Sequence, residues 1–158
     1  MRPHALILAS AFAALTVTGS LRAEEAGTCL ATQPSGVTLG KPFPSSDHWF
    51  GSESLAVILP PGGVWMGMGP EHRYRDKLFW WSHGFRPGSE SNLVVRGRRL
   101  DRESPPADIS RATNAHSPSL GGWTMLVAVE FPSAGCWEIT GEYLGQKLSF
   151  VVSVPSST

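Results

Sequence analysis

The 158-residue chain has only two cysteines, Cys29 and Cys136, and no excess of charge, with 13 basic and 13 acidic residues. Two cysteines so far apart exclude a scaffold of several disulfides and any Cys-x-x-Cys zinc or redox motif. The balanced charge provides no basic footprint for nucleic acid or for an anionic membrane surface.

Catalytic signatures are absent as well. There is no Gly-x-Ser-x-Gly and no His-Glu-x-x-His. The segment GVTLGKP is one residue short of a phosphate-binding loop and has Pro42 where that loop needs Ser or Thr. We therefore predict a non-catalytic domain without a cofactor.

The chain contains a single long apolar run, Ala5 to Gly19, which at fifteen residues is short of the roughly 20 that span a bilayer. Arg2 precedes the run, and the small residue Ala23 follows it. This layout predicts a secretory signal peptide over residues 1–23, and hence a periplasmic or secreted protein. A buried first helix and a lipoprotein cleavage before Cys29 are the alternatives, although the latter lacks Leu at the expected place. Removing the signal peptide leaves 11 basic and 13 acidic residues.

The rest of the chain reads as an irregular arm (24–46) and one β-domain (47–155). Period-two alternation and strand-prone composition predict about seven strands and no amphipathic helix. The predicted strands cover residues 55–59, 64–68, 77–81, 93–98, 123–131, 136–143 and 147–154. In the fifth of these, Trp123 and Phe131 are expected to point inward. Residues 103–122 show no periodicity and are predicted to form a long mobile loop. This pattern indicates an all-β, antiparallel, immunoglobulin-like β-sandwich.

The segment that begins at Cys136 predicts where the cysteines lie. On a strand Trp137, Ile139 and Tyr143 share one face, and the other face carries Cys136, Glu138, Thr140 and Glu142. Because the Trp face is apolar, it should be the core face, and Cys136 should point outward. Cys29 is the only other thiol in the chain, so export predicts a Cys29–Cys136 disulfide that ties the arm to the last hairpin. Two free thiols or a bridge between chains are the alternatives.

Several stretches resemble a group of small exported bacterial proteins of unknown function. The chain is similar to them in FPSAGCWEITGEYLGQKLSFVVSV, in WFGSESLAVILPPGGVW, in KLFWW and in VRGRRLD, in patches between His48 and Val154. Those proteins likewise carry an early cysteine and end in a Phe-Pro…Gly-Cys-Trp-Glu hairpin. The resemblance implies export and a β-sandwich but no activity.

Met66 and Met68, with His72 four residues further on and His83 beyond, are the best candidate for a metal site. Thioethers and imidazole together suit copper, especially Cu(I). The alternative is that both Met side chains fill gaps in the core, as their alternation with Val64 suggests.

Aromatic and basic side chains are the other candidates for binding. Trp80 and Trp81 are neighbours on a strand, so only one can face the core, and the other is either covered or part of a binding surface. Arg96, Arg98 and Arg99 could hold an anion. Alternatively, they form a solvated strand face paired with Asp101 and Glu103.

These observations predict an exported interaction module that binds a protein or a polysaccharide at the cell envelope or outside the cell. The alternative is an exported protein that binds a small ligand or copper.

Overall fold

The computed structural model describes residues 29–37, 39 and 48–156, and within them the chain forms nine strands and three short 3-10 turns. The strands are β1 (Trp49–Ser52), β2 (Leu55–Ile58), β3 (Arg75–Trp81), β4 (Val94–Arg99), β5 (Asp108–Ile109), β6 (Thr113–Ser117), β7 (Gly122–Glu130), β8 (Gly135–Tyr143) and β9 (Gln146–Val154). The turns are η1 (Pro61–Gly63), η2 (Pro70–His72) and η3 (Pro118–Leu120). None of these helical turns is long and apolar enough to cross a membrane. The predicted signal peptide lies outside the described residues.

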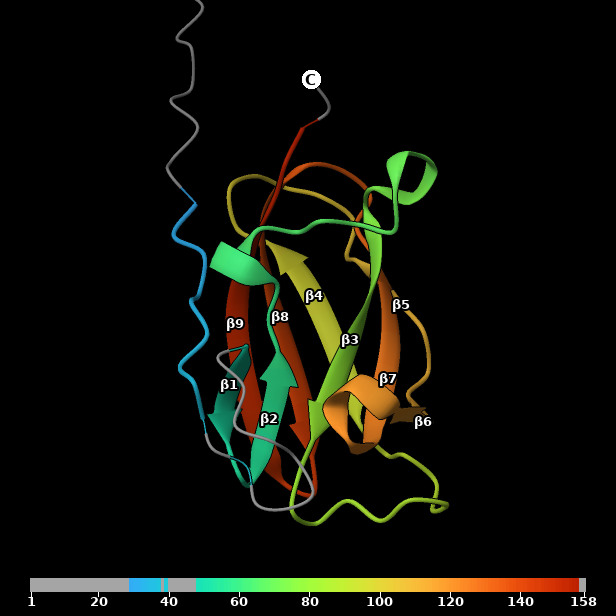
Figure 1. Ribbon diagram of the computed structural model, residues 1–158. Coiled ribbons are helices and arrows are strands. Elements are labelled where there is room, and N and C mark those ends of the chain that lie inside the picture. Colours follow the sequence, from blue (N-terminus) through green and yellow to red (C-terminus); the bar gives the residue numbers. More distant parts are fainter. Residues whose placement is uncertain (1–28, 38, 40–47, 157–158) are drawn as a thin grey trace, which may run out of the picture.

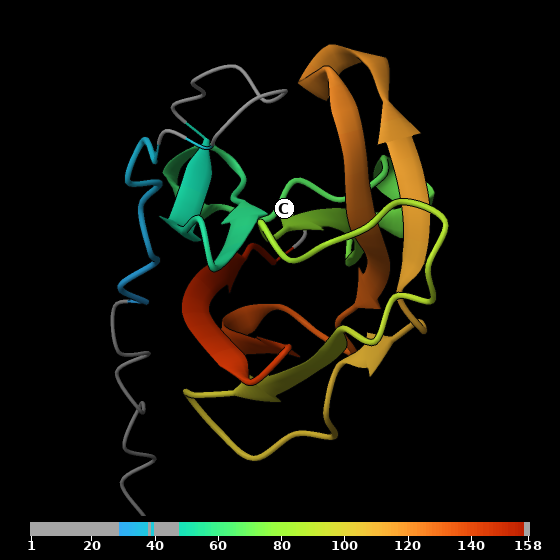
Figure 2. The ribbon, with the colours of Figure 1, turned by 90° about the horizontal axis from the view of Figure 1, so that it is seen from below.

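Two antiparallel sheets face each other and form the predicted β-sandwich (Figures 1 and 2). The larger sheet has the order β1-β2-β3-β7-β5, with β6 also paired to β7. The smaller sheet has the order β4-β8-β9. In Figure 2 the β6–β7 hairpin projects beyond the other strands.

The core lies between the sheets and is built from alternate residues of the long strands. β7 contributes Met125, Val127 and Val129, and β8 contributes Trp137 and Ile139, all at most 1% exposed. This is the period-two pattern that the sequence predicts for a strand with one buried face. The β8–β9 hairpin turns through Leu144 and Gly145, both with positive φ (48° and 77°), as a tight two-residue loop requires.

The N-terminal arm crosses the open edge of β9, and a Cys29–Cys136 disulfide holds it there. The two sulfurs lie 2.11 Å apart and the Cα atoms 5.4 Å apart. Thr32 pairs with Val151 of β9 twice: its N–H donates to the carbonyl oxygen at 2.9 Å, and its hydroxyl accepts the Val151 N–H at 2.9 Å. The arm therefore covers part of an edge of β9 that would otherwise be open to association with other chains.

The same arm covers the outer face of the larger sheet. Leu39 is 2% exposed and forms a second apolar cluster with Trp49 and Ala56. Trp81 and Leu120 pack against this cluster. The arm is thus anchored at two places, by the disulfide and by Leu39.

The prediction of seven strands is wrong in four places. The predicted strand 64–68 does not form, because Gly62, Gly63 and Gly67 all have positive φ (64°, 67° and 69°). The chain instead crosses to the smaller sheet, where Trp65 donates its N–H to the carbonyl oxygen of Ser153 at 2.8 Å. Trp65 is buried, whereas Val64 is 39% exposed. Three strands that the sequence did not indicate, β1, β5 and β6, bring the number to nine.

Residues 103–122 are not one long loop, since they contain β5, β6 and η3. β6 has polar residues on both faces and pairs with β7 from Thr113↔Leu126 to Ser117↔Gly122. Main-chain pairing to β7 holds this strand without apolar alternation. At its far end Trp123 is 44% exposed instead of buried, since the projecting hairpin carries it beyond the core, and the His116 ring lies edge-on to it at 5.3 Å.

Candidate functional site

A polar groove runs across the outer face of the β4-β8-β9 sheet. Arg96 and Arg98 lie on β4, and strand pairing places them directly opposite Thr140 and Glu138 of β8. The pairing of β8 with β9 adds Ser149, opposite Thr140. Seven polar side chains of this outer face line the groove: Arg96, Arg98, Glu138, Thr140, Glu142, Lys147 and Ser149.

These polar side chains are paired with one another across the strands. Arg98 Nε lies 2.6 Å from Glu138 Oε2, and the Thr140 and Ser149 hydroxyls are 2.7 Å apart. Arg96 Nη1 lies 3.8 Å from Glu142 Oε1. Both arginine side chains are more than two-thirds exposed. Arg96 and Arg98 therefore form a solvated, ion-paired strand face, but their partners are Glu142 and Glu138 of β8 and not the predicted Asp101 and Glu103.

The segment Pro106–Ile109 forms one wall of the groove. The Ala107 N–H donates to the Gly97 carbonyl oxygen at 3.1 Å, which ties the segment to the edge of β4. Val95 and Ile109 add apolar surface, and the groove has a volume of about 990 Å³. Its charges balance, since Asp108, Glu138 and Glu142 offset Arg96, Arg98 and Lys147.

The next arginine, Arg99, has a different role. Its side chain is only 4% exposed and donates from Nε to Asp101 Oδ1 at 2.6 Å and from Nη2 to Oδ2 at 3.1 Å. It also donates from Nη1 to the Ser133 hydroxyl at 2.7 Å and lies 5.9 Å from the Trp137 ring. The hydrogen bonds that Arg99 donates to the Asp101 carboxylate lower the pKa of Asp101 below its usual 3.8, against the opposing effect of burial. Arg99 therefore holds the loop that follows β4 and is not free to bind an anion.

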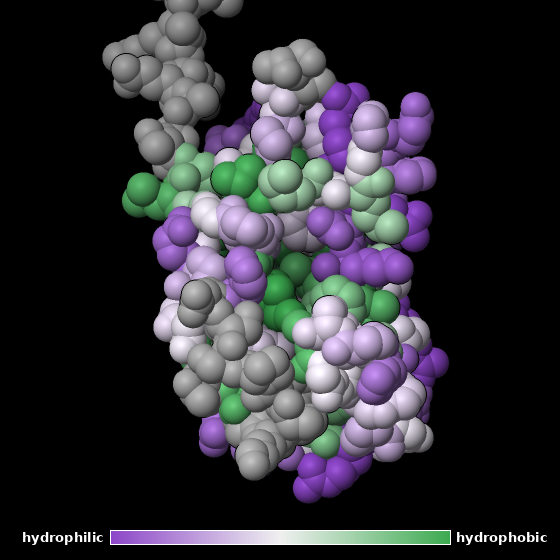
Figure 3. Space-filling view, viewed as in Figure 1, coloured by the Kyte–Doolittle hydropathy of each residue, from purple (hydrophilic) through white to green (hydrophobic). Residues whose placement is uncertain are grey.

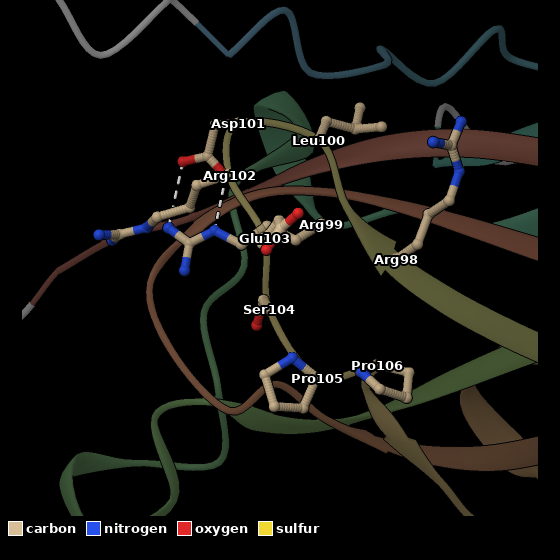
Figure 4. Close-up of a pocket in the computed structure, with 9 residues that line it drawn as sticks. All are labelled: Arg98, Arg99, Leu100, Asp101, Arg102, Glu103, Ser104, Pro105 and Pro106. Atoms are coloured by element: carbon tan, nitrogen blue, oxygen red, sulfur yellow. Dashed lines mark hydrogen bonds and ion pairs between the residues drawn. The ribbon is translucent and has the colours of Figure 1, made fainter. Parts of the chain in front are cut away.

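Residues 98–106, which form the end of β4 and the loop that follows it, surround a shallower depression next to the groove (Figure 4). Figure 4 shows Asp101 turned toward Arg99, whereas the side chain of Arg98 points away from this pair. Arg98 and Pro106 also line the groove, so the two depressions are continuous.

Trp80 and Trp81 do not form a binding platform. Trp80 has no exposed surface and packs in the core against Phe150, with ring centroids 5.7 Å apart. Trp81 points to the opposite side of the sheet, as predicted, where it packs against the second cluster beneath Leu39. Trp123 is the tryptophan with the largest exposure in the described part of the chain.

The methionines of the copper candidate do not fill the core. Met66 is 69% exposed and Met68 49% exposed, both in the segment between η1 and β3. Met68 donates its N–H to the His72 carbonyl oxygen at 3.1 Å, so the main chains of these residues are close. His83 lies beyond β3, where its ring contacts the Glu53 carbonyl oxygen at 3.0 Å. No group of three or more His, Cys, Asp or Glu able to hold a metal exists among the described residues. The copper site stays a prediction.

An apolar hollow opens on the other sheet, between β2 and β3. Leu59, Trp65 and Leu78 reach it from the core, and the exposed Met66 lies at its rim. Figure 3 shows apolar surface over the line between these strands, surrounded by hydrophilic side chains.

The sequence indicated part of the groove. Arg96 and Arg98 were candidates, and alternation already put Glu138, Thr140 and Glu142 on one face. What it did not show is that β4 pairs with β8, which places the arginines beside those carboxylates.

Comparisons with protein-family models, with curated proteins and with solved structures find no match to this chain. The resemblance to small exported bacterial proteins therefore stays a prediction.

Proposed function

We propose that this protein is a non-catalytic binding domain that acts outside the cytoplasm and holds a neutral, hydroxyl-rich polymer such as a polysaccharide in the groove on β4-β8-β9. One observation carries the proposal: this groove is lined by hydroxyls, by three carboxylates and by two guanidinium groups and an ammonium group whose charges cancel. These groups can donate and accept hydrogen bonds to a sugar hydroxyl without attracting a charged polymer. Val95 and Ile109 supply apolar surface for the sugar rings.

The spacing of the carboxylates supports binding over hydrolysis. Glu138 and Glu142 are four residues apart on one strand, which separates their Cα atoms by about 13 Å. Glycosidases place their two carboxyl groups about 5–9.5 Å apart.

The proposed location rests on the predicted signal peptide and on the disulfide. A Cys29–Cys136 bond persists in an oxidising compartment such as the periplasm or the cell exterior.

Affinity electrophoresis through gels containing neutral polysaccharides, with dextran, xylan, mannan and a mixed-linkage β-glucan as probes, tests the proposal. We expect at least one of them to retard the protein, and Arg98→Gln to abolish the retardation. Arg75→Gln is the matched control, since Arg75 is an exposed arginine beside Glu130 on the other sheet. No retardation by any neutral polymer, or equal loss in both variants, would contradict the proposal.

Retardation by polygalacturonate or dextran sulfate alone would also contradict it, because the groove would then select for charge.

A further inference from the structure

The apolar hollow between β2 and β3 suggests a second binding site, on a surface that the proposed function does not use. Its floor consists of side chains that belong to the core, Leu59, Trp65 and Leu78, each at most 3% exposed. Its volume of about 320 Å³ is at the lower end of the range for small-molecule sites, roughly 300–1,000 Å³. It therefore suits one large apolar side chain better than a whole cofactor.

The hollow exists because β2 leaves β3 early. The two strands pair only at Ala56↔Trp81 and Val57↔Trp80. Pro60 and Pro61 then end β2, and the chain crosses to the other sheet at Trp65.

This departure leaves one side of β3 open next to the hollow. On its other side β3 pairs with β7 from Arg75 to Trp80. The Arg75 carbonyl oxygen faces away from β7, since it accepts the Met68 N–H at 2.9 Å. Main-chain groups alternate along a strand, so those of Lys77 and Phe79 face the same way, toward the hollow. None of the described strands pairs with β3 at these two residues.

The Lys77 N–H is bonded to the Asp76 carboxylate at 2.7 Å. The Lys77 carbonyl and the Phe79 N–H, which flank Leu78 on the open side, are an acceptor and a donor that no described strand pairs with. A single residue of an extended polypeptide can satisfy both groups, as in the pairing of parallel strands.

From this geometry we infer that the hollow binds a short extended segment of another protein. The segment pairs its main chain with Lys77 and Phe79 and inserts one large apolar side chain against Trp65. Main-chain groups at strand spacing select a polypeptide, and the apolar floor selects the inserted side chain. A lipid tail would leave the donor and acceptor of β3 without matching partners, and a sugar would place polar hydroxyls against the apolar floor.

Fluorescence anisotropy with a defined peptide tests the inference. The probe is a labelled eight-residue peptide in which phenylalanine and valine alternate with threonine and lysine. The matched probe has the same side chains but N-methyl groups on alternate amides, which removes the donors of one edge. We expect the parent peptide to bind and the N-methylated peptide to bind about tenfold more weakly, the effect of one or two main-chain hydrogen bonds.

Two variants of the protein place the site. Met66→Glu puts a charge at the rim of the hollow, where the side chain is exposed enough for the fold to tolerate it. Met68→Glu is the matched control, an exposed methionine of the same segment that does not line the hollow. We expect the first variant to weaken peptide binding at least fivefold and the second to leave it unchanged. In the bound state the Phe79 amide should exchange its hydrogen more slowly.

Absence of peptide binding, equal binding of the two peptides, or equal effects of the two methionine variants would overturn the inference. A concentration-dependent dimer in sedimentation that Met66→Glu dissociates would also overturn it, because the occupant would then be a second copy of the chain. None of these outcomes depends on polysaccharide binding, so this test and that of the groove fail separately.

Discussion

Breaking the Cys29–Cys136 disulfide should lower stability without changing the sandwich. The bond closes a loop of 107 residues. In the chain-entropy model such a loop removes about 16 cal/mol/K from the unfolded state, which corresponds to about 4.8 kcal/mol at 25 °C. With a urea m-value of about 2 kcal/mol/M, the midpoint of unfolding should fall by about 2 M.

The two anchors of the arm determine how the reduced protein responds. Leu39 is buried, so its end of the arm should stay in place when the disulfide opens. At the other end the Thr32–Val151 hydrogen bonds remain, together with one from Gln33 Nε2 to the Gly62 carbonyl oxygen at 3.1 Å, and these should fray. Hydrogen exchange at the Thr32 and Val151 amides should therefore accelerate. Amides in the β4–β8 pairing should exchange faster in the reduced protein only by the amount that the loss of global stability explains.

Urea unfolding of the oxidised protein and of Cys29→Ser/Cys136→Ser is the assay, with the same proteins in dithiothreitol. The reductant should shift the wild-type midpoint and leave the double variant unchanged. Equal midpoints for the oxidised wild type and the variant would refute the reasoning on loop closure. Two cysteines that alkylate in the native exported monomer would show that the bond does not form.

Four further substitutions probe the core and the Arg99 loop. A Cβ on Gly141 would overlap the Trp80 ring, so we expect Gly141→Ala to cost about 1–3 kcal/mol in urea unfolding, and less in a Trp80→Leu background. Trp80→Ala should cost about 3–5 kcal/mol, and Trp81→Ala clearly less because Trp81 is half-buried; equal costs would contradict the packing. Asp101→Asn should cost about 1–3 kcal/mol at pH 7, because Arg99 then loses an ionic partner. Since the folded state lowers the pKa of Asp101, this difference should be complete above about pH 4 and shrink as the pH falls further; a difference independent of pH would show that the pair does not act through charge.

The sequence predicted the features that depend on the period of two. Trp137, Ile139 and Tyr143 are buried, and Cys136 lies outside the core cluster, as the alternation required. The Cys29–Cys136 pairing followed from that face and from the absence of any other thiol. These predictions succeeded because a strand with one buried face carries its orientation in its own residues.

Strands held mainly by main-chain pairing were missed for the opposite reason. β6 is Thr-Asn-Ala-His-Ser, and nothing in its side chains indicates a strand, since β7 alone holds it in the sheet. For residues 64–68 the opposite error occurred, since the sequence predicted a strand that does not form. Val64, Met66 and Met68 alternate in the sequence, but the positive φ of Gly63 and Gly67 prevents a continuous strand, and the buried side chain is that of Trp65. Local pattern cannot reveal which strand a segment will meet.

The candidate sites could not be predicted for the same reason, because both are formed by the way in which strands pair. The groove exists because β4 pairs with β8, a contact between residues about 40 positions apart in the chain. The hollow exists because β2 ends just before two prolines while β3 continues, so that the two strands pair over only part of the length of β3. Neither arrangement is a motif. In this protein the residues that a ligand would contact are ordinary strand residues. Whether they can bind a ligand depends on which strand edges are paired, which are covered by the arm, and which remain open.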